Sequence, residues 1–159
     1  MYADILERTN TNPTPLEEIL REREAIERSF ARIRKAFFLE AIRSDHGLPL
    51  TLAEEFNSLR DHVALLFTLD PPDSASTIAT SCPHLAIEAD LLGRERDELF
   101  LALSDLADRA EGGRGRFRHG AEQKLELEFV QFEARFLEHQ IREAEFTNHT
   151  LYDEIGVGD

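Results

Sequence analysis

Apolar residues recur along the chain at alternating steps of three and four, and no stretch alternates apolar and polar residues as a strand would. Four helices of about twenty to thirty residues joined by short loops are typical of an all-α fold. We expect an up-down-up-down antiparallel four-helix bundle that forms a single domain over 1–159. The predicted elements are helices over about 15–44, 51–70, 83–111 and 121–148, followed by an irregular tail over 149–159.

Residues with known end preferences mark the helix boundaries. Thr14 suits an N-cap, Pro15 suits the first turn, and Glu17 stands where a capping box needs its carboxylate. Pro71 and Pro72 cannot continue a helix and therefore end the second one.

The stripe predicted to face inward is apolar in each helix except at one or two positions. The polar exceptions are Arg23, Asp70, Arg96, His139 and Glu143, so every helix carries at least one. The apolar members are Leu16, Ile19, Ile26, Phe30, Ile33 and Phe37; Leu52, Phe56, Leu59, Val63 and Leu66; Leu85, Ala89, Leu92, Leu99, Leu103 and Leu106; and Leu125, Phe129, Phe132, Phe136 and Phe146.

In an antiparallel bundle these polar breaks lie at a similar height, within ~12 Å along the helix axes. Buried charges are costly unless they are paired. Two arginines, two carboxylates and a histidine can cancel one another, which predicts a buried ion-pair network. Taken one at a time, each residue has another interpretation, a side chain near a helix end that reaches solvent.

The chain is acidic, with a formal net charge of -14 and 42% hydrophobic residues. This balance argues against nucleic acid and anionic membrane surfaces as partners, since both need clustered Lys and Arg. The single cysteine, Cys82, allows no disulfide within the chain. The polar N-terminus shows no leader and no run of apolar residues spans a membrane, so we expect a cytoplasmic protein.

The segment LEHQIREAEFTNHTLYDEIGVGD at the C-terminus resembles the end of bacterial hemerythrin-like (HHE cation-binding) proteins. In those proteins a ligand HxxxE is followed by a Tyr and by an acidic residue, Ile, Gly, any residue, Gly and Asp. The resemblance implies a four-helix bundle with a di-iron site. Its ligands are a His from the first helix, an HxxxE from the second, a His from the third and an HxxxE from the fourth.

Carried over onto this sequence, the ligand pattern is incomplete. The fourth helix matches in full with His139 and Glu143, but the second would place Leu66 and Asp70 at its HxxxE pair. The first and third helices have Arg23 and Arg96 where the resemblance implies histidines. A guanidinium keeps its proton and cannot bind a metal, whereas sites of this kind use imidazole and carboxylate ligands.

Our hypothesis is a hemerythrin-like bundle without a functional di-iron centre and without a cofactor, whose two arginines neutralise the remaining carboxylates. It would not be an enzyme and would serve a structural, sensory or interaction role. The alternative is an oxygen- or redox-sensing protein that binds iron, either as a pair or singly through Asp70, His139 and Glu143. An oxidase or peroxidase using such a metal is a third hypothesis.

The sequence leaves the partner open between another protein and a small apolar ligand, and it does not define the oligomeric state. An apolar cavity lined by Phe136, Phe146 and Leu66 beside the ion pairs is the expected place for such a ligand.

Overall fold

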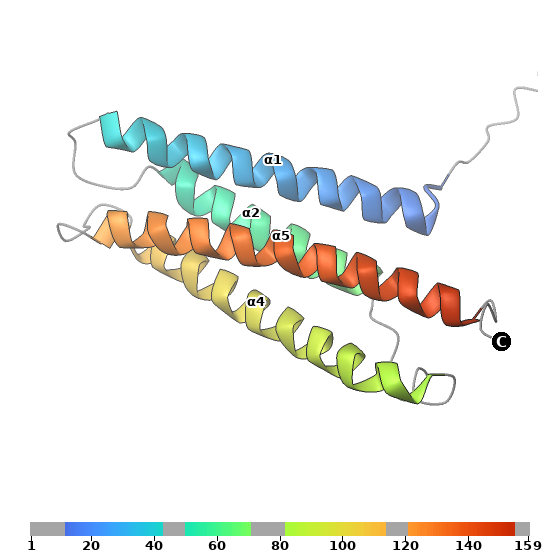
Figure 1. Cartoon of the computed structure of the whole chain (residues 1–159). Coiled ribbons are helices and arrows are strands. Elements are labelled where there is room, and N and C mark those ends of the chain that lie inside the picture. The colour runs from blue at the N-terminus through green and yellow to red at the C-terminus, as the bar shows by residue number, and fades with distance from the viewer. Residues whose placement is uncertain (1–11, 43–49, 71–81, 114–120, 155–159) are drawn as a thin grey trace, which may run out of the picture.

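The computed structural model describes residues 12–42, 50–70, 82–113 and 121–154, and these residues are all-α. Figure 1 shows the long helices lying side by side along their lengths. The elements are the α-helices α1 (Pro15–Ile42), α2 (Leu50–Leu69), α4 (Ala86–Gly112) and α5 (Ala121–Glu154), with the short 3-10 helix η1 (Pro83–Leu85) directly before α4.

The capping box predicted for α1 is confirmed. The Glu17 backbone N–H donates to the Thr14 hydroxyl oxygen at 3.2 Å, and the Thr14 backbone N–H donates to the Glu17 carboxylate at 2.9 Å. Two donors that the helix itself leaves unpaired are satisfied in this way. The predicted end of this helix at residue 44 lies outside the described residues.

The prediction of an irregular tail from residue 149 is wrong for residues 149–154, which continue α5. No glycine or proline occurs in this stretch, and the first glycine is Gly156. The Thr147 hydroxyl donates to the Glu143 carbonyl and the Thr150 hydroxyl to the Thr147 carbonyl, so both side chains bond back onto the helix. Weak helix formers without a breaker do not end a helix.

The third predicted helix begins with a different geometry than expected. The Leu85 backbone N–H donates to the Cys82 carbonyl at 3.0 Å, which makes Pro83–Leu85 a 3-10 turn before α4. At the other end, the Gly113 backbone N–H donates to the Arg109 carbonyl. The predicted limits of 83–111 therefore agree with the combined span of η1 and α4 to within one residue.

The inward stripe read from the sequence forms the core. Its apolar members are buried, apart from the half-buried Ile19 and from Leu16, which is 64% exposed. Leu16 occupies the first turn of α1 and is mostly exposed to solvent, so its assignment to the core is wrong. A second, smaller apolar cluster, separate from the main core, consists of Cys82, Leu85, Ala89, Leu92 and Phe146.

Neighbouring helices along the chain pack on each other: α1 on α2, α2 on α4, and α4 on α5. The backbones of α1 and α5 approach each other less closely, and phenylalanine rings fill the space between them. Phe30 of α1 has its ring centroid 6.0, 6.2 and 5.6 Å from those of Phe129, Phe132 and Phe136 of α5. Rings at these distances attract beyond the effect of area burial.

Among the described residues, no helix has the length and apolar character needed to cross a membrane.

Candidate functional site

Arg96 enters the interior from the middle of α4 and is held by three groups. Its guanidinium forms a two-pronged ion pair with Glu143 of α5, one prong running from Nη2 to Oε2 at 2.8 Å. Nη1 donates to the backbone carbonyl of Phe67 in α2 at 3.3 Å, and Cζ lies 4.7 Å from the centre of the Phe67 ring. Forked pairing and stacking on a ring are contacts that suit arginine in particular.

His139 is completely buried and stands between two carboxylates. Its Nε2 lies 2.7 Å from Glu143 Oε1, and its Nδ1 lies 2.9 Å from Glu95 Oε1. Glu95 also pairs with Arg142 nearer the surface. A continuous row of paired polar side chains therefore runs from the solvent-facing Arg142 through Glu95, His139 and Glu143 to Arg96.

The position of Glu143 in this row of side chains, between His139 and Arg96, keeps its carboxylate ionised. Burial alone raises the pKa of its carboxyl group, but hydrogen bonds from His139 and Arg96 and the charge of Arg96 lower that pKa to about 2. Because an ionised carboxylate only accepts hydrogen bonds, the 2.7 Å contact places a proton on His139 Nε2.

Arg23 and Asp70 do not belong to this buried network. They pair with each other, Arg23 Nη2 to Asp70 Oδ2 at 3.4 Å, with side chains that are 46% and 40% exposed. Arg23 lies in the N-terminal third of α1 and Asp70 directly follows α2, where neighbouring helices cover less of the seam. The prediction that both are buried is therefore wrong.

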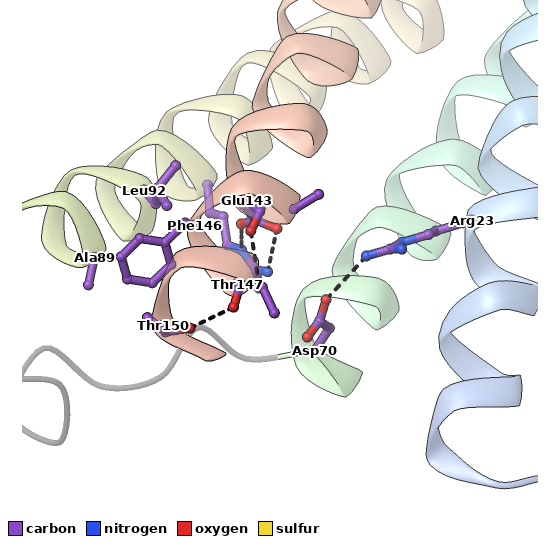
Figure 2. A pocket seen from close by; sticks show the side chains of 10 residues that line it. Arg23, Asp70, Ala89, Leu92, Glu143, Phe146, Thr147 and Thr150 are labelled. Carbon is purple, nitrogen blue, oxygen red and sulfur yellow. Dashed lines mark hydrogen bonds and ion pairs between the residues drawn. The ribbon is translucent and has the colours of Figure 1, made fainter. Parts of the chain in front are cut away.

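The two ion pairs nevertheless border the same pocket, which has a volume of about 260 Å³ and is lined by residues of α1, α4 and α5 and by Asp70, directly after α2. Figure 2 shows Arg23 and Asp70 joined on one side of it and Glu143 on the other. Ala89, Leu92 and Phe146 supply an apolar wall. Four of the five polar seam residues, Arg23, Asp70, Arg96 and Glu143, thus line one space, whereas His139 lies behind Glu143.

This pocket is only partly the cavity expected from the sequence. Phe146 lines it, but Leu66 and Phe136 belong to the main core and do not.

The residues present do not fit the metal centre that the family resemblance implies. Within the described ranges, no three His, Cys, Asp or Glu side chains are gathered so as to hold a metal ion, and this includes Asp70, His139 and Glu143. Both ring nitrogens of His139 already contact carboxylates, and the Arg96 guanidinium lies against the oxygens of Glu143. A fixed positive charge at that place opposes the entry of a cation.

Sequence reasoning missed Glu95, Arg142 and Phe67. Glu95 and Arg142 each stand one position before a seam residue, Arg96 and Glu143 respectively, so the heptad count places them outside the stripe. The sequence does hold one signal for them: a residue of opposite charge directly precedes both Arg96 and Glu143. Such neighbours can add further ion pairs between α4 and α5, as Glu95 does with Arg142 and His139. The role of the Phe67 carbonyl has no signal in the sequence.

Comparison with family models, with curated proteins and with solved structures finds no match to this chain.

Proposed function

We propose that this chain is a hemerythrin-like bundle in which an ion-pair network replaces the di-iron centre, and that it acts in the cytoplasm as a non-enzymatic interaction module. The family relationship rests on the C-terminal segment 137–159 and on the seam positions of the polar residues. In this proposal the protein carries no cofactor, and its strongly acidic chain favours basic or neutral partners.

The arrangement that we propose is the up-down-up-down antiparallel bundle. In support, each long helix packs on the next one along the chain, as short connections between antiparallel neighbours require. In Figure 1 the colour runs along α1 in one direction and returns along α2, and α4 and α5 repeat this reversal.

One observation carries the proposal: four seam residues, on α1, α4 and α5 and directly after α2, border a single pocket, and two of them are arginines paired with two carboxylates. In a bundle of this family the ligand side chains converge in the same way. Here Arg96 supplies beside Glu143 the positive charge that a metal would otherwise supply. The network then serves to hold α4, α5 and α2 in register, because Arg96 of α4 contacts both of the other two helices.

The test is the metal content of protein purified from cells grown with added iron, measured by elemental analysis and with a visible spectrum. We expect less than about a tenth of an equivalent of iron, manganese or zinc per chain and no absorption band in the visible range. One or two equivalents that survive dialysis, and that fall when Glu143→Gln is introduced, would refute the proposal. The exposed Glu145→Gln on the same helix is the matched control.

A further inference from the structure

The outer face of α5 carries an uninterrupted apolar stripe that the core does not use. Starting at Leu127, apolar residues follow at steps of three, four, three, four and three. The members are Leu127, Val130, Ala134, Leu137, Ile141 and Ala144, and all six are exposed. At ~1.5 Å per residue the stripe is ~25 Å long, and at ~3.6 residues per turn it lies roughly opposite the buried Phe129 and Phe136.

Single exposed leucines are ordinary on protein surfaces, whereas a continuous apolar patch marks an interaction site. The exposed fractions of the stripe are substantial: 59% for Leu127, 50% for Val130 and 60% for Ile141. Figure 1 shows α5 in front of α2 and between α1 and α4, so this outward side is not covered by another described helix. The spacing is that of a seam which receives the knobs of a second helix.

The outer face of α4 provides an internal comparison. Ile87, Leu91 and Leu101 are exposed there at related spacing, but Arg94 and Glu98 interrupt the row. That face is therefore a solvated helix surface with scattered apolar residues, and α5 differs from it by continuity.

The positions on both flanks of the α5 stripe are acidic or neutral. They are Glu126, Gln131, Glu133, Glu138, Gln140 and Glu145, with no Lys or Arg among them. Two arginines of the same helix, Arg135 and Arg142, are directed to α4, where they pair with Glu98 and Glu95. Flanking charges select the partner of a helical seam.

A second copy of this chain is a poor occupant of the stripe. Packing α5 on another α5 would bring flanking carboxylates face to face in either orientation, and the chain as a whole has a net charge of -14. Like charges across a helical interface oppose association. Lys or Arg on the flanks of a partner would instead face Glu138 and Glu145. Glu133, another flanking carboxylate, already pairs with Arg34 of α1.

A hollow beside the stripe adds a second feature. A pocket of about 150 Å³ between α1 and α5 is lined by Leu137, Phe136, Phe30 and Gln140, among others. The Gln140 side-chain nitrogen Nε2 is buried there and has no hydrogen-bond partner among the described residues. A buried donor of this kind is satisfied when an acceptor arrives. A partner side chain that enters at Leu137 meets a hollow lined by Phe30, Phe136 and the Gln140 donor, and also by the charged Arg23 and Glu27.

We infer that the outer face of α5 binds a basic amphipathic helix of another protein, with an apolar seam on the stripe and Lys or Arg at the flanks. This inference rests on the interaction role proposed above and names its partner class, but it does not depend on whether the chain holds a metal.

The probe is a labelled synthetic peptide of about three heptads with Leu at the seam positions and Lys at the flanks, titrated with the full chain by fluorescence anisotropy. A second peptide has the same seam and Glu at the flanks. We expect saturable binding of the Lys peptide and at least about tenfold weaker binding of the Glu peptide. The affinity for the Lys peptide should fall as the salt concentration rises from about 50 to about 500 mM.

Two variants locate the binding face. Ile141→Gln, on the stripe, is expected to weaken binding of the Lys peptide by about tenfold or more, since one buried aliphatic side chain is lost. Ile87→Gln, at the 73% exposed position on α4, changes the same class of residue off the stripe and should alter binding by less than about twofold. Circular dichroism melting of both variants checks that they fold.

Three results would overturn the inference. They are equal binding of the two peptides, equal losses in the two variants, and a dimer in sedimentation equilibrium that Ile141→Gln dissociates, which would assign the stripe to a second copy. Because the same batch is analysed for metal, a bound metal with intact peptide binding would refute the proposed metal-free centre alone.

Discussion

Arg96 occupies a seam position that in a regular heptad is apolar, and its side chain is nevertheless buried. Removing it would leave Glu143 charged and without its main partner in a site that is 12% exposed. Breaking a buried pair in this way typically costs about 3 to 5 kcal/mol. We therefore expect Arg96→Met to lower the free energy of unfolding by about 3 kcal/mol, measured by urea denaturation.

The matched control for this substitution is Arg94→Met, two residues away on the same helix. Arg94 forms an exposed pair with Asp90, so its loss should change stability by less than about 1 kcal/mol. Similar effects of the two substitutions would show that the Arg96 pair contributes no more than a surface contact.

The lowered pKa of Glu143 predicts how stability depends on pH. Its pKa falls from an ordinary 4.5 to about 2 in the fold, because the hydrogen bonds from His139 and Arg96 outweigh burial. A carboxyl group with a lowered pKa in the folded state contributes stability that is complete above pH ~4.5 and is lost as the pH falls towards 2. The contribution at neutral pH is ~3 kcal/mol.

Glu143→Gln removes this titration. We expect the difference in unfolding free energy between wild type and variant to shrink as the pH is lowered from 6 to about 2, measured by urea denaturation at each pH. Many other carboxyl groups titrate over the same range, so the exposed Glu145→Gln is run in parallel, and its difference from wild type should stay flat. A flat difference for Glu143→Gln as well would contradict the assigned role of the carboxylate.

At the residue scale, the sequence predicts the charged centre better than its edges. Arg96, His139 and Glu143 are brought together because heptad counting works where four helices surround a position. Arg23 and Asp70 are misjudged because the same count carries no information on how far the neighbouring helices extend past a helix end. Glu95 is missed because its side chain reaches the interior from a position outside the stripe.

At the scale of elements, helix number, order and inward face follow from apolar spacing alone, because each long helix has one dominant stripe. Helix ends are predicted well where a specific residue sets them, as Thr14 and Gly113 do. They are predicted poorly at residue 148, where the choice between helix and coil rests on small differences in propensity. The outer stripe of α5 is missed because the heptad count assigns each helix one apolar stripe, the inward one, and does not look for a second.

The aromatic contact between α1 and α5 is an element-scale feature with a testable energy. Phe30 contacts three phenylalanine rings of α5 across a wide gap between the two backbones, which cannot close easily if the ring is removed. We expect Phe30→Ala to lower the free energy of unfolding by about 4 kcal/mol in urea denaturation. Phe38→Ala, on the same helix at a 65% exposed position, should change it by less than about 1 kcal/mol. A loss below about 2 kcal/mol for Phe30→Ala would mean that α1 and α5 collapse onto the vacated space.

At the scale of the whole molecule, the described arginines nearly all have carboxylate partners, and the chain still has an excess of acidic groups, 32 against 18 basic ones. Arg109 illustrates this use of cations. Burial lowers the pKa of its guanidinium, but hydrogen bonds to Glu128 and Asp105 outweigh burial, so the pKa is raised above its ordinary value. Much of the positive charge is therefore taken up in ion pairs, and the acidic residues in excess give the chain its net negative charge.

The proposed relation of the bundle to hemerythrin-like di-iron proteins predicts that metal binding can be restored. In the variant Arg23→His, Leu66→His and Arg96→His, two fixed cations are removed and three imidazoles are placed at the seam positions implied by the resemblance. We expect the folded variant to bind about one to two ferrous ions per chain under anaerobic conditions, measured by elemental analysis after gel filtration, and to melt at a higher temperature when loaded. Adding Glu143→Gln to the same variant should reduce the bound iron, because it removes a carboxylate ligand while the imidazoles stay. If the folded variant binds no more iron than wild type, this result contradicts the proposal that the two seam arginines take the place of a metal.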